Sequence, residues 1–325
     1  MKFTIGFEKE DADKLHKSWD EIIETQKWSE GKFTEQFEEK WREYNKVDQA
    51  VSFSSWGGAA LAALEYYGVK NQIVLCPSNT FMATPLSVVK AGGWVEFVDC
   101  NKEDLCMSFE NLKVKVEKYK PKAVWLVHIG GHIAFQTREI AEYCQQKGII
   151  LLEDCAHAHG ASWNGKRAGT WGEAGIYSFY ATKTISTGEG GMLVTKNKDL
   201  AEFAKKYRNY GKFDYQVEGL NYRINEFAAA IGCLQTDRLE EIVAWKNEYA
   251  RKHLDPQFKN RIIFPKGMVS GYYKYIVFEP IEKSTGKVYD QPCHKIMGKE
   301  YELPNTDWVA KNHWCVPLYY KGDEA

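Results

Sequence analysis

The sequence lacks any long run of charge of one sign. Its 325 residues include 43 lysines and arginines and 44 aspartates and glutamates, so the net charge is close to zero. Internal repeats and low-complexity segments are absent as well. A basic stripe of the kind that neutralises phosphates is missing, which argues against a nucleic-acid-binding protein. An anionic ligand would have to be held by a few local groups.

Paired cysteines and long apolar runs are also missing. The eight cysteines form no Cys-x-x-Cys pair, and the start, Met1 to Gly6, does not have the pattern of a signal peptide. No apolar run approaches the roughly 20 residues that a membrane-spanning helix needs. We therefore expect a soluble protein of the reducing cytoplasm that does not enter a membrane.

The chain instead alternates between short apolar segments and helical patterns. This alternation is typical of right-handed βαβ units and predicts an α/β fold whose central sheet is mostly parallel, with helices on both faces. Strands are expected at 50–53, 73–75, 94–98, 123–128, 149–154, 174–180, 192–195 and 272–278. Helices are expected at 8–25, 33–44, 59–67, 83–90, 108–118, 138–147, 226–239 and 242–253.

One lysine, Lys183, lies in a turn between two of these expected strands, bounded by Gly188, Gly190 and Gly191. A single lysine in a polar loop is more often a solvated surface residue. However, the apolar run that precedes Asp154 reads as a buried parallel strand, and open α/β sheets place ligand groups at the carboxyl ends of such strands. We therefore expect Lys183 and Asp154 to carry the chemistry.

An aspartate at a strand end and a lysine in a glycine-rich turn are what pyridoxal phosphate requires. The lysine amine forms a Schiff base with the aldehyde of the cofactor, and the acid keeps the pyridine nitrogen protonated so that the ring can accept electrons. An ordinary lysine, with a pKa of about 10.4, is a poor nucleophile at neutral pH. The site must therefore lower that pKa by burial or by nearby positive charge.

The ordered motifs of the chain are similar to those of the DegT/StrS sugar aminotransferases, within the fold type I pyridoxal-phosphate enzymes. The resemblance covers most of the chain as far as Leu239 and thins afterwards. The residues that carry it are Phe33-x-x-x-Phe37-Glu38, Ser54-Ser55, Pro77-Ser78-x-Thr80-Phe81-x-Ala83-Thr84, Val127-His128, Glu153-Asp154, Gly160-Ala161, Ser178-Phe179, Lys183, Thr187-Gly188-Glu189-Gly190-Gly191, Asn221-Tyr222-Arg223 and, near the end, Pro317-Leu318-Tyr319.

The resemblance implies a fold type I architecture and a specific reaction. Residues 1–240 would form a large cofactor-binding domain with the N-terminal helices, and residues 241–325 a small C-terminal α+β domain. The enzyme would transfer an amino group from glutamate, through pyridoxamine phosphate, to a nucleotide-linked keto-sugar. Such reactions supply amino sugars for surface polysaccharides, other glycans or secondary metabolites.

The resemblance also implies how the cofactor is held. Its phosphate would lie at the turn formed by Trp56, Gly57 and Gly58, where backbone N–H groups precede a helix. Relatives usually have a hydroxyl residue after the glycine here, and this chain has none. Backbone N–H groups would therefore make most of the hydrogen bonds to the phosphate. Without the resemblance, this stretch reads as an ordinary strand-to-helix turn.

Four further side chains have implied roles beside plainer alternatives. Phe81 would stack on the pyridine ring or be a core aromatic, and His157 would contact the ring or be structural. Ser178 would bind the phosphate or simply end its strand. Asn221 would reach the phosphate of the neighbouring subunit, which makes a homodimer with shared sites, or it would cap the helix that follows.

No metal site is expected. His128, His132, His157 and His159 are close in sequence, but no cysteine joins them at the spacing of a zinc site.

The end of the chain departs from the family. The histidine segment that shapes the sugar pocket in relatives is only loosely matched by residues 289–294, and the closing helix usual in the family is missing before Ala325. These departures leave a second hypothesis open, a sugar-nucleotide binding or regulatory protein that has lost catalysis. A sugar dehydratase of the same family is a third, although such enzymes normally have histidine at the position of Lys183.

Overall fold

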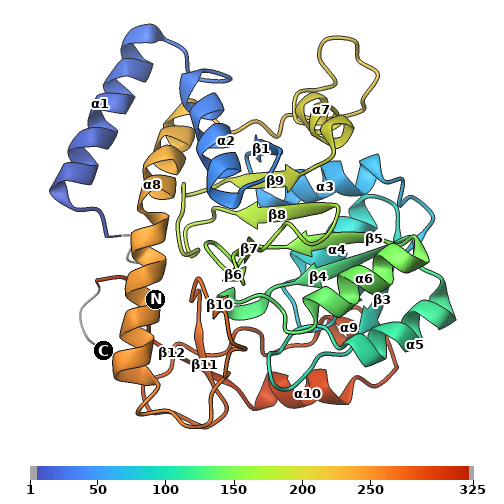
Figure 1. Cartoon of the computed structure of the whole chain (residues 1–325). Helices are drawn as coiled ribbons and strands as arrows, with labels where there is room; N and C mark the ends of the chain where they lie inside the picture. Colours follow the sequence, from blue (N-terminus) through green and yellow to red (C-terminus); the bar gives the residue numbers. More distant parts are fainter. Residues whose placement is uncertain (1–5, 322–325) are drawn as a thin grey trace.

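The computed structural model describes residues 6–321. Residues 1–5, where we expect no signal peptide, and residues 322–325 lie outside the described part. A seven-stranded sheet with the strand order β1-β9-β8-β5-β4-β2-β3 forms the centre of the molecule (Figure 1). Its strands are β1 (Gln49–Phe53), β2 (Ile73–Pro77), β3 (Trp94–Val98), β4 (Ala123–Val127), β5 (Ile150–Asp154), β8 (Ala174–Ser178) and β9 (Gly191–Thr195).

The sheet is mostly parallel, as predicted. All the neighbouring pairs from β8 to β3 are parallel, whereas β9 runs antiparallel to both β1 and β8. The connection between β8 and β9 therefore begins and ends at the carboxyl edge of β8. Lys183 lies in this connection, at the same edge as Asp154.

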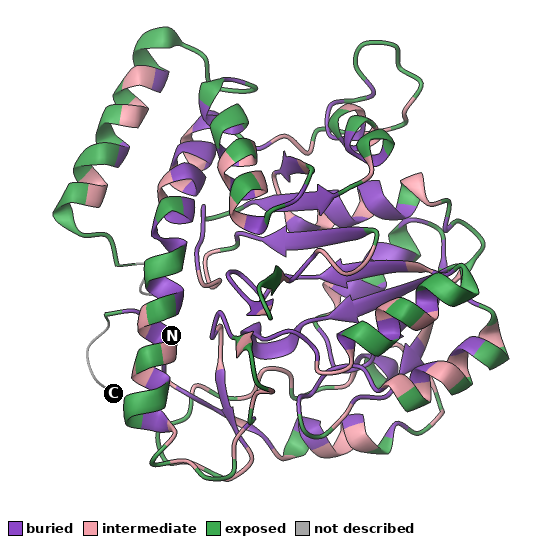
Figure 2. Ribbon diagram, viewed as in Figure 1, coloured by how far each residue is buried: buried purple, intermediate pink, exposed green. Residues whose placement is uncertain are grey.

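Helices cover both faces of the sheet, and the strands between them are almost entirely buried (Figure 2). On one face α3, α4 and α7 pack on the strands, and on the other α2, α5, α6 and α8 do so. The helices are α1 (Lys9–Thr25), α2 (Lys32–Asn45), α3 (Trp56–Tyr66), α4 (Ala83–Lys90), α5 (Phe109–Tyr119), α6 (Thr137–Lys147), α7 (Lys198–Tyr207) and α8 (Glu226–Tyr249). Within residues 6–321, no helix has both the length and the apolar character needed to cross a bilayer.

The prediction that Trp56, Gly57 and Gly58 form a turn before a helix at 59–67 was wrong, because α3 begins at Trp56. The Ser55 hydroxyl accepts a hydrogen bond from Gly58 N–H at 3.2 Å and so caps the helix. Trp56, Gly57 and Gly58 thus form its first turn. Gly58 must be small at this position, since a Cβ there would approach the Tyr222 ring to 2.9 Å.

The prediction of two helices over 226–253 was also wrong. A single helix, α8, runs from Glu226 to Tyr249 and continues as a short π-helical segment, Ala250–Leu254. It begins at Asn225, whose side chain accepts from Ala228 N–H at 2.9 Å. Residue 240 lies in the middle of α8, so the expected division between residues 240 and 241 falls inside one continuous helix.

A buried carboxylate attaches α2 to α8. Glu226, in the first turn of α8, accepts from the backbone N–H groups of Gly31, Phe33 and Thr34 at 2.8–3.0 Å and from the Thr34 hydroxyl. These N–H groups at the start of α2 have no partners within their own helix. One side chain of α8 therefore caps α2 and sets the position of the two helices relative to each other.

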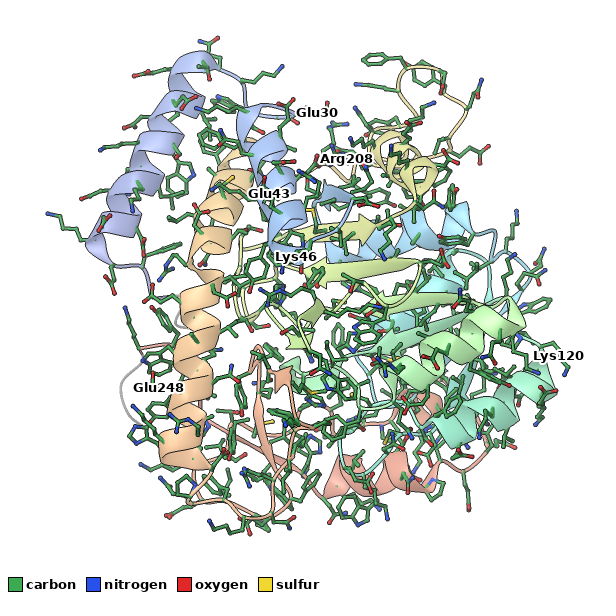
Figure 3. All side chains as sticks on the ribbon, viewed as in Figure 1. Glu30, Glu43, Lys46, Lys120, Arg208 and Glu248 are labelled. Atoms are coloured by element: carbon green, nitrogen blue, oxygen red, sulfur yellow. The ribbon has the colours of Figure 1, made fainter. Side chains whose placement is uncertain are left out.

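A second polar contact joins the N-terminal helices to the sheet. Arg208 follows α7 and is labelled in Figure 3. It donates to Ser52 O of β1 at 2.6 Å and pairs with Glu38 of α2. Its neighbour Asn209 donates to Glu30 at 2.8 Å. The segment after α7 is thereby anchored before the chain reaches Asn221.

The last part of the chain forms a small α+β unit below the sheet in Figure 1. The expected strand at 272–278 is shorter, because only β11 (Tyr275–Val277) pairs, with β12 (Trp314–Val316). A three-stranded sheet joins this unit to the large one, since β10 (Met268–Val269) pairs with β6 (Ser162–Trp163), which pairs with β7 (Lys166–Arg167). The helices α9 (Cys293–Ile296) and α10 (Pro304–Lys311) complete it.

Candidate active site

A cavity of about 810 Å³ opens at the carboxyl edge of the sheet, a size suited to a cofactor together with a substrate. Seven of the nine predicted site residues line it, and the C-terminal unit closes one side. The predicted residues in its wall are Trp56, Gly57, Phe81, Asp154, His157, Ser178 and Lys183. Gly58 and Asn221 are not in the wall of this cavity.

Lys183 is half-buried in the wall of the cavity. Its Nζ lies 4.8 Å from the centroid of the Tyr273 ring, and no hydrogen bond or ion pair to Nζ is formed within residues 6–321. Burial lowers its pKa to about 8, with Asp154 opposing the shift and Lys274 adding to it. An appreciable fraction of the amine is therefore uncharged and nucleophilic at neutral pH, as the predicted role requires.

Asp154 ends β5 and is buried. Its Oδ1 accepts from Ala156 N–H at 3.0 Å, and its Oδ2 accepts from the Thr84 hydroxyl at 2.8 Å. Burial raises its pKa, and these two hydrogen bonds oppose that rise. A buried carboxylate of this kind gains from a protonated ring nitrogen placed against it.

The residue before it, Glu153, points to the other face of the strand and holds the surrounding backbone. Its carboxylate accepts from the N–H groups of Gly169, Trp171 and Gly172 at 2.7–2.8 Å and contacts His128 Nε2 at 2.9 Å. His128 Nδ1 accepts from Ala134 N–H, so its Nε2 carries the proton that Glu153 receives. Glu153 and His128, which belong to motifs shared with the family, therefore stabilise the backbone around the site.

A hydroxyl is present at the N-terminus of α3 after all. Ser55, at the helix cap, lines the cavity beside Trp56 and Gly57. The expectation of a mostly backbone contact to the phosphate stays a prediction, and Ser55, which precedes the glycines instead of following them, adds a side-chain hydroxyl to this turn. Helix N-termini attract phosphates through their free N–H groups and dipole.

Aromatic rings border the cavity at two places, at Phe81 and at the stacked pair His157 and Tyr273. Phe81 precedes α4 and is 64% exposed, so its ring is free to stack on a flat ligand. His157 is buried and stacks on Tyr273 with 4.1 Å between ring centroids. Its Nδ1 accepts from Gly130 N–H and its Nε2 contacts the Tyr289 hydroxyl, both at 3.3 Å, while burial lowers its pKa well below the usual value. His157 is therefore neutral, with its proton on Nε2.

Ser178 and Asn221 occupy different surroundings. Ser178 ends β8, is buried and lines the cavity, with Tyr180 N–H donating to its hydroxyl at 3.4 Å. Asn221 is exposed, and its side chain accepts only from Arg223 N–H, at 3.2 Å, within the described chain. The alternative that Asn221 caps α8 was wrong, because Asn225 does so.

Sequence reasoning missed most of the wall that the C-terminal half supplies. These residues include Lys246, Tyr273, Lys274 and Lys287, whereas Tyr289 belongs to the loosely matched segment 289–294 and also lines the cavity. Asp290 and Gln291 also line the cavity, whereas His294, which the loose family match includes, is buried elsewhere and contacts Ser78 at 2.7 Å. Lys246 carried a usable signal, since it is a lysine on the buried face of a predicted helix.

Two buried groups have ligand atoms close enough for a metal ion, Asp104–Cys106–His132 and His128–Glu153–Cys155. Hydrogen bonds within the protein already use the carboxylates of both. Asp104 accepts from Phe135 N–H and Cys106 N–H, and burial raises the pKa of the Cys106 and Cys155 thiols well above the usual value. Neither thiol is thus disposed to ionise as a metal ligand.

The residues of the cavity fit pyridoxal phosphate. Lys183 offers an amine with a lowered pKa, Asp154 a buried carboxylate, and Ser55 and Ser178 hydroxyls, while Phe81 offers an exposed ring. These groups come from four separate segments and meet at one edge of the sheet.

Comparison with known proteins agrees with this geometry. A GDP-perosamine synthase of Vibrio cholerae is 33% identical over 228 residues, which is 68% of this chain and 62% of that protein, so the chain spans less than two thirds of it. A dTDP-3-amino-3,4,6-trideoxy-alpha-D-glucose transaminase of Micromonospora megalomicea is 28% identical over 98% of this chain and 92% of its own length. The crystal structure of the aminotransferase TlmJ from Streptoalloteichus hindustanus superimposes with a TM-score of 0.87 at 27% identity, covering 96% and 91% of the two chains. The profile of the DegT/DnrJ/EryC1/StrS aminotransferase family matches residues 9–267, and the chain belongs to that family.

Proposed function

We propose that this protein is a pyridoxal-phosphate-dependent aminotransferase that transfers an amino group, from glutamate, to a nucleotide-linked keto-sugar. The observation that carries the proposal is that Lys183 and Asp154 line one cavity at the carboxyl edge of the sheet. Membership of the family and the names of the two relatives support the sugar-nucleotide substrate. Substrates of that kind supply amino sugars for polysaccharides and other glycans.

The cofactor, when bound, would supply an electron sink that stabilises a carbanion at the substrate carbon bearing nitrogen. The residues that would hold it are Lys183 through its aldehyde, Asp154 at the ring nitrogen, and Ser55 and Ser178 at the phosphate. Phe81 would stack on the ring, and His157 would border it. Trp56 and Gly57 supply the first turn of α3 behind the phosphate.

Lys183 has a second task in this mechanism. When it is not bonded to the cofactor, Lys183 Nζ would be placed to take up a proton at the substrate carbon and to give it back. A base with a pKa near the working pH is suited to both directions of transfer, and burial brings that of Lys183 to about 8. Asp154 would stay ionised beside the ring nitrogen, so that this nitrogen would keep its proton throughout.

We further propose a homodimer whose two sites are shared. Asn221 is exposed and does not line the cavity of its own chain. A residue that contacted the phosphate within its own subunit would line that cavity. Its position after the anchored segment at Arg208 and Asn209 supports a role toward a second copy. Neither the binding-protein hypothesis nor the dehydratase hypothesis gains from the geometry, since Lys183 and Asp154 are both in place.

A direct test uses purified protein with pyridoxal phosphate, glutamate and a panel of keto-sugar nucleotides. We expect visible absorbance from the bound cofactor that bleaches on adding glutamate, and an aminated sugar nucleotide detected by mass spectrometry. The Lys183→Ala variant is the control and should keep its fold while losing both signals. A colourless protein that remains colourless with added cofactor would contradict the proposal and favour a binding protein.

A further inference from the structure

Lys246 is a buried lysine that the proposed reaction does not use. It projects from the last turn of α8, is only 6% exposed and lines the cavity. Its Nζ donates to Tyr272 O at 3.0 Å, and no carboxylate pairs with it among residues 6–321. An ammonium group has three N–H donors, so two remain for a ligand in the cavity.

Lys274 brings a second positive charge to the same wall. Its Nζ lies 5.1 Å from the centroid of the Tyr273 ring, which Lys183 Nζ also approaches, at 4.8 Å. It has no ion pair in the described part of the chain. Backbone hydrogen bonds from Gly271 and Lys274 N–H to Gly131 and Gly130 O hold this segment in place.

A third lysine of the wall, Lys287, is already occupied. Its Nζ donates to the carbonyl oxygens of Lys311 and His313, each at 2.8 Å, and lies 4.0 Å from the Trp314 ring. Lys287 therefore joins parts of the C-terminal unit, whereas Lys246 and Lys274 have donors to spare. The difference separates a structural lysine from two that are free to bind.

The carboxylates of the cavity do not neutralise this pair. Asp154 is engaged by Thr84 and Ala156, and Glu189 and Asp290 are exposed, with no ion pair to either lysine. Burial, together with the nearby charge of Lys274, lowers the pKa of Lys246 to about 8. Two like charges near each other and partly out of water are unfavourable without an anion between them.

We propose that Lys246 and Lys274 form an anion-binding subsite that takes a carboxylate or phosphate group of the substrate. The proposal rests on the proposed function for the identity of that substrate. The cofactor phosphate would have other donors, at Ser55 and the N-terminus of α3, and would not need these lysines. Two sources of the anion remain, the carboxylates of the amino donor and the diphosphate of the sugar nucleotide.

Calorimetric binding to the cofactor-loaded enzyme distinguishes the two sources without requiring turnover. The probes are succinate, which represents a dicarboxylate donor, and a nucleoside diphosphate, uridine or guanosine. The first variant is Lys246→Met, which keeps an apolar side chain of similar length. The second is Lys274→Gln, which should alter little packing because the Lys274 side chain is half-exposed. Lys90→Gln, at the exposed end of α4, is the charge-matched control.

We expect each of the two variants to raise the Kd of one probe at least tenfold and to leave the Kd of the cofactor unchanged. The control variant Lys90→Gln should bind both probes like the parent protein. Loss of succinate binding assigns the subsite to the donor, and loss of nucleotide binding assigns it to the sugar diphosphate. If Lys274→Gln, with an unchanged melting temperature, binds both probes like the parent protein, the subsite is wrong. A rise in the cofactor Kd equal to the loss of probe binding would also overturn it, because the lysines would then hold the cofactor.

Failure of the proposed function gives a different result. If the protein binds a probe through these lysines but transfers no amino group, the proposed subsite is supported and the proposed aminotransferase activity is contradicted. If the protein transfers amino groups and neither substitution changes its KM values, the aminotransferase activity is supported and the proposed subsite is contradicted.

Discussion

The hydroxyl of Thr84, in the first turn of α4, donates to Asp154 Oδ2 at the carboxyl end of β5 at 2.8 Å. This contact helps keep a buried carboxylate ionised, since burial raises its pKa and the hydrogen bond lowers it. The helix after β2 thus tunes a residue on a strand two places away in the sheet.

We predict that Thr84→Val weakens the role of Asp154. Without the hydroxyl its pKa rises further, so the ionised form that pairs with the ring nitrogen is lost at a higher pH. The acid limb of kcat/KM should move to higher pH, and a charge-assisted hydrogen bond of about 1.5–3 kcal/mol corresponds to roughly a ten- to hundredfold loss of cofactor affinity. Thr84→Ser, which keeps the hydroxyl, should recover most of the loss. An unchanged pH profile in Thr84→Val would contradict this assignment.

The lowered pKa of Lys183 predicts how the cofactor-free enzyme captures pyridoxal phosphate. Only the uncharged amine reacts, and with a pKa of about 8 roughly a tenth of it is uncharged at pH 7. The second-order rate constant for capture, followed by absorbance, should therefore rise about tenfold above pH 7 and level off above pH 9. A rate that keeps rising through pH 10 would mean an ordinary, solvated lysine. Lys183→Ala should show no covalent capture at any pH.

Asn221→Ala tests the shared site. If Asn221 donates to the phosphate of the neighbouring subunit, its loss should raise the cofactor Kd about ten- to hundredfold while the fold is unaffected. Asn225→Ala is the matched control, because it removes the cap of α8 and should cost about 1 kcal/mol of stability without the same loss of cofactor.

Mixing subunits makes the test sharper. A heterodimer of an Asn221→Ala subunit and a Lys183→Ala subunit has one site with both defects and one with neither, so activity should reappear after subunit exchange. A fully active monomer, or no recovery under demonstrated exchange, would show that each site is complete within one chain.

Glu153→Gln should separate stability from chemistry. The carboxylate accepts from three backbone N–H groups and His128, and an amide places its own NH₂ against some of these donors. We expect a loss of about 3 kcal/mol or more in the free energy of unfolding, measured with urea. Glu202→Gln, exposed on α7, should leave stability unchanged. Equal urea midpoints for the two variants would mean that the network does not stabilise the fold.

The parts of the site that follow directly after strands were predictable from sequence. Asp154 and Ser178 end buried strands, and their apolar runs and positions identify the edge of the sheet where ligands bind. Lys183 was identified by its glycine-rich turn. Local periodicity likewise predicted most of the helices and strands and the parallel order of the sheet.

What sequence missed depends on contacts between distant segments. Lys246 and Tyr273 line the cavity only because α8 and the segment after β10 pack against it. The helical pattern places Lys246 on a buried face, but no local pattern shows which cavity that face borders. The start of α3 was misplaced because a cap at Ser55 outweighs the low helix propensity of two glycines. The continuity of α8 arises from burial along its length, including Leu239 and Ile242 on either side of the expected break.

The reversed strand β9 bears on how this scaffold can diversify. Ser178 pairs with Gly191, so the segment that carries Lys183 starts and finishes at adjacent points and needs no crossover helix. Lengthening such a segment costs little closure entropy and leaves the pairing of every strand unchanged. Insertions or deletions around the reactive amine can therefore be sampled in evolution, or by an engineer, without rebuilding the architecture that supports it.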